Sequence, residues 1–375
     1  MGCGSQQTKE STPVQLMISS KIYTDKINNS TVFSSVRCIP LETNLDVLID
    51  DIVKIIHKEN FIYVADRFAL YKFNEEGILC GKIKRNGPGP KEYHGIADFE
   101  IETDKTVWIL SRTDKTLYRY TWDNVLENSI KINYWATKMY FISPDTICVY
   151  VGNERDENNQ HQLKTINLST NSVINNHLEI DEKKAKFLHV HSANHFSKDF
   201  NRQNELYFFN IFDDEIYKWS NNDIKPAFKM NINNKNIPSS FYEHNYNDVR
   251  EFFQSLFRGN YAYGTVLFME YENEYLYAYL YEKERHFSLI SKKNNEAILD
   301  FKIINEDVML SGFPINLTEQ SYFIQKNNEL ILPLLPSDIV EYSKSSLNAE
   351  SQQKVYQHIK YTDENQNPVL LILNR

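Results

Sequence analysis

The sequence predicts an all-β fold, a six-bladed β-propeller of four-stranded antiparallel blades. The first observation behind this prediction is a short apolar, aromatic-rich strand pattern that occurs six times. Successive copies begin 40 to 70 residues apart, a loose period in the range of propeller blades. The second observation is composition: 24 tyrosines and 22 phenylalanines supply a large core, whereas 11 glycines in 375 residues exclude collagen-like and glycine-linker proteins.

Each copy has neighbouring strands in the same order. The six recurring strands are expected at residues 62–66, 107–110, 147–150, 206–209, 276–279 and 330–332. Two more strands follow each of the first five, at 70–73 and 78–83, 117–120 and 125–132, 163–166 and 173–180, 216–219 and 224–232, and 287–290 and 298–303. An inner strand precedes each copy, at 52–56, 96–101, 138–142, near 191–196, 265–271 and 314–323. A β-sandwich pair or a barrel is the competing architecture, but neither explains six copies in one internal order.

Asparagine pairs are expected to form several of the turns. Three pairs, at 221–222, 294–295 and 327–328, each separate two apolar runs. Asparagine tolerates the left-handed backbone conformation that glycine otherwise supplies. The alternative, a codon bias towards asparagine, would raise the number of asparagines without placing pairs between strands.

The two ends of the chain are expected to pair with each other. The last copy lacks an outer strand after residues 368–373, and segment 32–40 is predicted to fill that place and close the ring. Two insertions, 239–257 and 346–359, carry apolar residues at spacings near three and four, which predicts two short helical insertions.

Residues 1–18 are expected to form a flexible tether ahead of a single propeller domain at 19–375. The first residues are small and polar around Cys3, as in a bacterial lipoprotein cut just before its lipidated cysteine. That likeness implies lipid attachment at Cys3 and a place in the bacterial cell envelope, in the periplasm or on the outer-membrane surface. A frayed terminus with a stray cysteine is the alternative.

The charge balance argues against nucleic-acid binding. Lys and Arg total 41 and Asp and Glu total 50, which gives a net charge of −9. Such a chain has no reason to condense on a phosphate backbone. No Walker loop, H-E-x-x-H motif, G-x-S-x-G motif or EF-hand loop occurs in the sequence. We therefore predict no cofactor and no nucleic-acid partner, and we expect a monomer that meets a membrane only through its N-terminal anchor.

Four short motifs carry a family resemblance. They are residues 36–43, residues 62–66, Gly-Pro-Gly-Pro-Lys-Glu-Tyr at 87–93 followed by Asp-Phe, and Asn-Pro-Val-Leu at 367–370. Together they resemble the six-bladed β-propeller lipoproteins of Bacteroidetes, and the likeness covers nearly the whole chain after residue 30. The blades are more distantly similar to NHL repeats. The resemblance implies the fold, export and lipidation, and it implies no reaction.

The long connections are expected to gather on one face of the propeller. In a four-stranded antiparallel blade, the loop between strands two and three lies on the same side as the link to the next blade. Ligand binding usually resides on such loops. Arg67, Arg112, Arg155 and Arg285 each follow the second strand of a different blade, so four guanidinium groups would surround the channel mouth and suit a carboxylate, sulfate or phosphate. Four solvated arginines balanced by nearby acids are the alternative.

Two other groups of residues are candidates for a site. Tyr93 follows the rigid Gly-Pro-Gly-Pro turn, which either presents it to a ligand or sets the entry to the second blade. His189, His191 and His195 have an H-x-H-x3-H spacing, which would seat a metal if a carboxylate joined them. Polar core or rim histidines are the alternative.

These observations predict a binding or interaction module with its ligand site on the long-loop face near the central channel, and the resemblance implies that it is exported and lipid-anchored. The expected partner is a small molecule, a glycan or another protein. One alternative is an NHL-like propeller enzyme, a lyase or hydrolase that uses a metal at the channel mouth. Another is a structural partner of an outer-membrane nutrient system.

Overall fold

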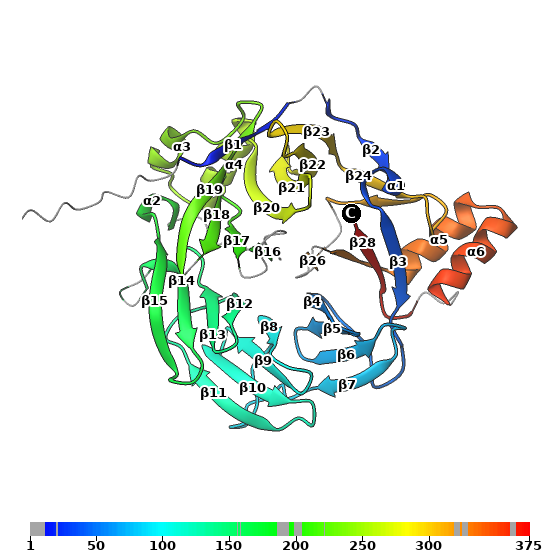
Figure 1. The fold of residues 1–375 in the computed structure, drawn as a ribbon, viewed down its shortest axis with the longest axis horizontal. Helices are drawn as coiled ribbons and strands as arrows, with labels where there is room; N and C mark the ends of the chain where they lie inside the picture. Colours follow the sequence, from blue (N-terminus) through cyan, green and yellow to red (C-terminus); the bar gives the residue numbers. More distant parts are fainter. Residues whose placement is uncertain are drawn as a thin grey trace, which may run out of the picture.

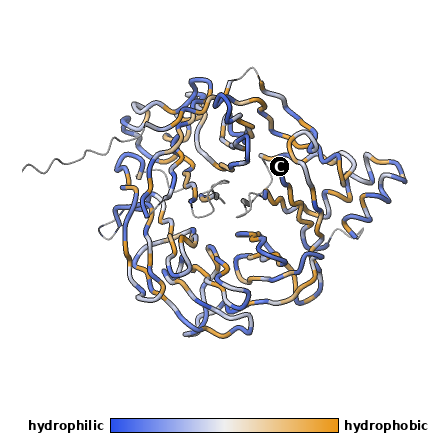
Figure 2. The backbone as a smooth tube through the Cα atoms, viewed as in Figure 1, coloured by the Kyte–Doolittle hydropathy of each residue, from blue (hydrophilic) through white to orange (hydrophobic). Residues whose placement is uncertain are grey.

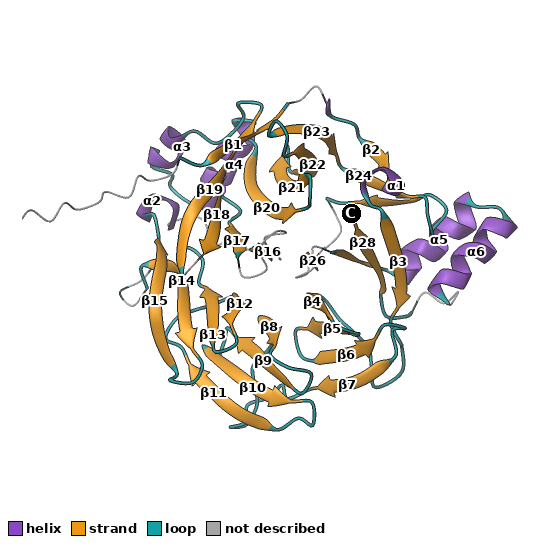
Figure 3. Cartoon of the chain, in the orientation of Figure 1, coloured by secondary structure: helices purple, strands orange, loops and turns teal. Residues whose placement is uncertain are grey.

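The chain forms an all-β structure whose sheets stand around a common centre (Figure 1), with the helices at the rim (Figure 3). The structure is a computed structural model, and it describes residues 12–19, 22–155, 157, 159–185, 195–198, 205–220, 222–318, 323–324, 329–360 and 365–375. All six recurring strands that the sequence predicts are present in this part of the chain, as the strands β5, β9, β13, β17, β21 and β27.

Three four-stranded antiparallel sheets follow one another along the first half of the chain. We call each set of four such strands a unit. Unit one consists of β4 (Ile52–Lys58), β5 (Phe61–Asp66), β6 (Leu70–Asn74) and β7 (Leu79–Ile83). Unit two consists of β8 (Asp98–Ile101), β9 (Thr106–Ser111), β10 (Thr116–Thr121) and β11 (Leu126–Lys131). Unit three consists of β12 (Lys138–Ser143), β13 (Thr146–Tyr150), β14 (His161–Asn167) and β15 (Ser172–Glu179).

The next two units are joined into one nine-stranded sheet. Unit four consists of β16 (Phe196–Lys198), β17 (Leu206–Phe209), β18 (Glu215–Ser220) and β19 (Asp223–Ile232). Unit five consists of β20 (Tyr263–Glu270), β21 (Glu274–Tyr281), β22 (Glu284–Ser291) and β23 (Glu296–Phe301). The joining strand is β1 (Val14–Ile18), which runs parallel to β19 and touches β23 at one pair of residues. The fold therefore begins earlier than the predicted tether of residues 1–18 allows.

Unit six contains both ends of the chain. It consists of β26 (Phe323–Ile324), β27 (Leu330–Leu334), β28 (Val369–Asn374) and β3 (Ser35–Pro40). β3 pairs with β28 over its whole length, from Ser35 opposite Asn374 to Pro40 opposite Val369. The predicted pairing of the N-terminal and C-terminal segments is thereby confirmed.

A small additional sheet corrects one predicted strand. Segment 314–323 was expected to be the inner strand of the last unit, but most of the apolar residues at its start belong to β25 (Phe313–Asn316). That strand pairs with β24 (Ile303–Glu306), which in turn pairs with β2 (Lys26–Asn28). The inner position is filled by β26 instead. An apolar segment does not by itself show which sheet it joins, so the sequence did not distinguish β25 from β26.

Both predicted helical insertions are helical. The first holds α3 (Ser239–Glu243) and α4 (Val249–Arg258), and the second, predicted at 346–359, is α6 (Ala349–Ile359). The helix before it, α5 (Pro336–Ser346), was not predicted. The side chain of Asp248 accepts a hydrogen bond from the backbone of Glu251 and so starts α4 afresh. Two shorter helices, α1 (Asn29–Val32) and α2 (Glu182–Ala185), complete the set in the described residues.

Aromatic side chains fill the spaces between neighbouring units. The rings of Tyr63 and Trp122 stack at 5.5 Å between units one and two, and those of Tyr207 and Phe268 meet edge to face at 5.1 Å between units four and five. Hydrophobic segments recur along the chain (Figure 2), and strands such as β5 and β9 are buried along nearly their whole length because sheets pack on both sides of them. The aromatic excess of the sequence is thus explained by packing between sheets.

Asparagine takes the place of glycine in the turns, as predicted. Asn222 and Asn295 have φ values of 62° and 61°, in the left-handed region. The third predicted pair, residues 327–328, lies outside the described residues. Asparagine thereby accounts for part of the low glycine content, since it tolerates positive φ better than other residues with a side chain.

A histidine between two glutamates connects unit one to unit six and should make stability depend on pH. His57 Nδ1 lies 2.6 Å from Glu329 Oε2, and its Nε2 lies 3.2 Å from Glu75 Oε1. The hydrogen bond to Glu329 is the main cause that raises the pKa of His57. A raised histidine pKa means that the stabilisation is complete below pH about 6.5 and is lost as the pH rises through the folded-state value.

We therefore expect His57→Gln to cost about 2 kcal/mol in unfolding free energy at pH 6 and less at pH 9. Urea denaturation of both proteins across this range measures the difference. A constant difference at all pH values would contradict a protonated His57 at this seam.

Candidate functional site

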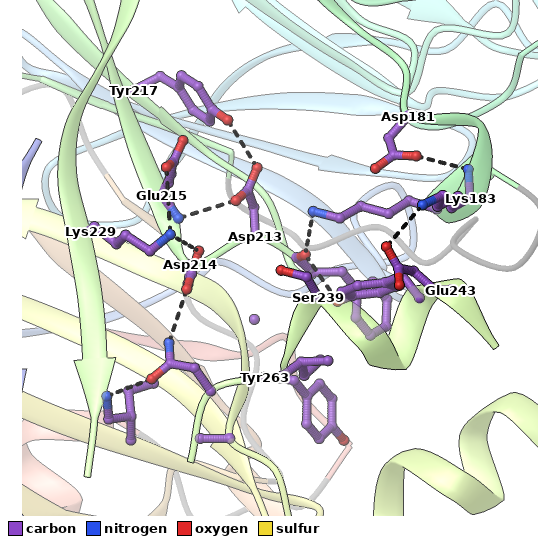
Figure 4. A pocket seen from close by; sticks show the side chains of 18 of the residues that line it. Asp181, Lys183, Asp213, Asp214, Glu215, Tyr217, Lys229, Ser239, Glu243 and Tyr263 are labelled. Carbon is purple, nitrogen blue, oxygen red and sulfur yellow. Dashed lines mark hydrogen bonds and ion pairs between the residues drawn. The ribbon is translucent and has the colours of Figure 1, made fainter. Parts of the chain in front are cut away.

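A pocket of about 380 Å³ lies between units four and five. Its walls come from α2, from the β17–β18 turn, and from the β19–β20 link with α3 (Figure 4). These are loops between strands two and three and links between units, the two kinds of connection that were expected to share one face. Their meeting in one pocket supports that expectation.

A glycine allows the two units to approach closely at the base of this pocket. Gly264 has a φ of +78°, and a Cβ atom there would lie 1.9 Å from the backbone oxygen of Ile211. No other residue fits without moving the backbone. The next residue, Thr265, donates a hydrogen bond from Oγ1 to the carbonyl of Asp213 at 3.2 Å. The start of β20 is therefore held directly against the β17–β18 turn, which carries Asp213.

The acidic wall consists of three successive residues, Asp213, Asp214 and Glu215. Tyr217 donates its hydroxyl hydrogen to Asp213 Oδ2 at 3.1 Å, and the side-chain amide of Asn236 donates to Asp214 Oδ2 at 3.2 Å. Burial is the main cause that raises the pKa of Asp214; the charge of Lys229 opposes this effect, and the charge of Asp213 adds to it. The three carboxylates of this wall outnumber its one cation, Lys229. The wall therefore favours a positively charged group.

The opposite wall carries lysines from α2 (Figure 4). Lys183 Nζ lies 3.3 Å from Glu243 Oε1. Lys184 Nζ donates to the carbonyl of Phe212 at 3.4 Å and lies 5.1 Å from the centre of the Tyr242 ring. Lys183 is thus paired with a carboxylate from α3, whereas Lys184 bonds to the backbone of the turn just before Asp213.

Arg67, Arg112 and Arg155 follow the second strands of their units as predicted, whereas Arg285 lies inside the third strand β22. Arg112 pairs with Glu154, and Arg155 pairs with Glu182 at the start of α2. Arg285 donates to the carbonyl of Leu317 at 3.4 Å. The fourth, Arg67, is exposed, with its guanidinium 5.6 Å from the ring of Phe68. None of the four is among the described residues that line the pocket, and Arg155 comes nearest through α2. An anion held by all four stays a prediction.

Tyr93 and His195 are both buried. The Tyr93 hydroxyl donates to the carbonyl of Phe68 at 3.0 Å, and its ring packs edge to face on Tyr120. His195 Nδ1 lies 3.0 Å from the carbonyl oxygen of Phe209, to which it can only donate. Both contacts serve packing, and we leave these residues out of the proposed site.

Three predicted site residues, Cys3, His189 and His191, lie outside the described residues. Within the described ranges, no three His, Cys, Asp or Glu side chains are grouped to hold a metal ion. The sequence alone does not predict this pocket. The run Asp213-Asp214-Glu215 and the helical insertion that follows it can be recognised in the sequence. That α2 lies close to them in space cannot.

Comparisons with known proteins identify the family and support the fold. A crystal structure of a Bacteroides fragilis protein described as exported superposes with a TM-score of 0.72 at 15% identity, covering 97% of this chain and 100% of that one. A member of the DUF4221 family from Bacteroides vulgatus superposes with a TM-score of 0.50 at 13% identity, covering 92% and 96%. No curated protein matches the sequence. Because the model of the domain of unknown function DUF4934 matches residues 14–374, the chain belongs to the DUF4934 family.

Proposed function

We propose that this protein is an exported binding module whose ligand occupies the pocket between units four and five. The B. fragilis protein of similar fold is described as exported, which supports the same route here. Among the described helices, none is long and apolar enough to cross a membrane. We further propose a lipid anchor at Cys3, for which the small polar residues around that cysteine are the support.

We also propose that the six units close into a six-bladed propeller. The pairing of β3 with β28 supports this arrangement, since it leaves the first and last strands of the ring in one sheet. The His57–Glu329 contact supports it as well, because it joins unit one to unit six. A closed ring gives the pocket a rigid frame, and it fits a monomer.

The proposed ligand is small and zwitterionic, with an ammonium group and a carboxylate. The observation that carries this proposal is the presence of both charges in one pocket: Asp213 and Asp214 come from the β17–β18 turn, and Lys183 and Lys184 come from α2. A ligand with both charges would satisfy both walls at once. The volume of about 380 Å³ suits a molecule of a few residues or less.

Glycylglycine is a suitable probe, and its binding should depend on Asp214. Isothermal titration calorimetry should detect its binding to the protein, with ammonium chloride and sodium acetate binding far more weakly. Asp214→Asn removes the charge with little change of shape and should weaken glycylglycine binding by tenfold or more, or about 1.4 kcal/mol.

Asp123→Asn, an exposed turn residue outside the pocket, is the matched control and should bind as the unchanged protein does. Equal affinities for the Asp214→Asn and Asp123→Asn variants would exclude the acidic wall as a binding surface.

A further inference from the structure

A second cavity, of about 370 Å³, lies where the N-terminal segment crosses unit five. It is separate from the first pocket, although Ile232 touches both. Its lining combines four aromatic and three acidic residues with two lysines, Lys235 and Lys302. The residues used below are Tyr23, Tyr279, Tyr281, His286, Glu282 and Glu284. Nothing in the proposed function above uses this cavity.

Three tyrosine rings surround His286 in this cavity. Its ring centre lies 5.5 Å from that of Tyr23, 5.2 Å from that of Tyr279 and 5.8 Å from that of Tyr281. Tyr279 stacks on His286, whereas Tyr281 meets it at 64°. Tyr23 is 40% exposed and comes from the N-terminal segment, so one wall of the cavity reaches solvent. Rings at such different angles form a cage with several π-faces and edges.

Negative charge surrounds these rings. Asp300 is buried and accepts hydrogen bonds from the Tyr279 hydroxyl at 3.1 Å and from Ser288 at 2.7 Å. Glu282 and Glu284 stand at the turn that connects β21 to β22. The π-face of an aromatic ring is itself electrostatically negative, so rings and carboxylates together favour a cation.

A lysine of the protein itself makes contacts of this kind, with a tyrosine ring and with carboxylates. The ammonium group of Lys302 lies 5.7 Å from the centre of the Tyr23 ring, 2.6 Å from Glu284 Oε2 and 3.4 Å from Asp25 Oδ1. The hydrogen bond to Glu284 is the main cause that raises the pKa of Lys302. The edge of the cavity thus holds an ammonium group against a tyrosine and two carboxylates, while Glu282, Tyr281 and His286 lie around the remaining space.

The turn at the mouth of the cavity holds its two residues in an unfavourable backbone conformation. Glu282 and Lys283 have φ values of 52° and 70°, and they are the only residues between β21 and β22. Two-residue turns of this kind favour Asn-Gly, because other side chains cost about 1–2 kcal/mol each in the left-handed region. This turn nevertheless places a glutamate at the cavity, and strained residues of this kind cluster at ligand sites.

We propose that this cavity binds an organic ammonium group, with Tyr23, Tyr281 and Glu282 around the cation. Two sources share this chemistry: a quaternary ammonium such as choline, and the side chain of a lysine in a peptide. The site is independent of the zwitterion pocket.

Calorimetric titration with choline chloride tests the proposal. We expect choline to bind, and its uncharged analogue, with a carbon in place of the nitrogen, to bind at least tenfold more weakly. Tyr281→Leu and Glu282→Gln should each weaken choline binding about tenfold, whereas Tyr281→Phe keeps the ring and should bind normally. Tyr356→Leu, in the distant helix α6, is the control for loss of a partly exposed tyrosine.

Nα-acetyl-lysine amide, titrated in parallel, distinguishes the sources: tighter binding than choline points to a peptide, and weaker binding to a choline-type group. No binding of either compound would overturn the proposal, as would equal binding of choline and its uncharged analogue. Asp214→Asn should leave choline binding unchanged, so failure here is distinguishable from failure of the zwitterion pocket.

Discussion

Replacing Asn367 with leucine should lower the free energy of unfolding by about 4 kcal/mol. The Asn367 side chain is 2% exposed and makes three hydrogen bonds. Its amide donates to the carbonyls of Glu42 and Val47, both at 2.7 Å, and its Oδ1 accepts from the backbone of Ile49 at 2.8 Å. Leucine has a similar volume but offers no partner, so three buried backbone groups lose theirs.

Chemical denaturation measures this loss, and Asn365→Leu is the matched control. Asn365 is exposed and lies two residues earlier in the same segment, so its replacement should change stability by less than about 0.5 kcal/mol. Similar effects at the two positions would mean that the hydrogen bonds of Asn367 do not hold this connection together.

Lys54→Met should cost about 3 kcal/mol or more. Lys54 Nζ lies 3.1 Å from Asp98 Oδ1 and 2.9 Å from Glu100 Oε1, and both carboxylates are 1% exposed. Burial alone would lower the pKa of Lys54, but the two carboxylates raise it above its ordinary value. Methionine fills similar space, yet it leaves two buried carboxylates without this cation. Lys138 lies near enough to Asp98 to interact with its charge and compensates in part.

A triple variant separates the loss of charge pairing from the loss of packing. Combining Lys54→Met with Asp98→Asn and Glu100→Gln removes the stranded charges, and we expect it to be more stable than Lys54→Met alone. Thermal or urea unfolding of the two variants gives the comparison. A triple variant less stable than Lys54→Met would show that unpaired carboxylate charge is not the reason why Lys54→Met loses stability.

Local sequence predicted the repeating part of the fold well. Strands such as β5 and β21 are apolar on both faces because sheets pack on both sides of them, and this makes a pattern visible in single sequences. Turns with paired asparagines marked the strand ends. The pairing of β3 with β28 could be predicted from the number of strands in each unit, because the last unit lacked a fourth strand.

Long-range pairing could not be predicted in the same way. β1 is a five-residue segment with three exposed residues, and its strand conformation depends on pairing with β19 and, at one position, with β23. The candidate pockets also depend on contacts between segments that are far apart in the sequence. Asp214 and Lys184 are 30 positions apart in sequence, and the close approach permitted by Gly264 depends on a contact with Ile211. A binding site whose residues come from three or more separate loops leaves no recognisable pattern in any one stretch of sequence.

The pairing of two N-terminal strands, β1 and β3, also sets an order of folding. Both strands are made well before their partners, β19 and β28. At about 5–20 residues per second, roughly 20–70 s separate the synthesis of β3 from that of its partner. Units one to three contain only strands that are consecutive in the chain, so they can form while both N-terminal segments wait. The native pairing of β3 can therefore form only after more than 300 further residues have been made.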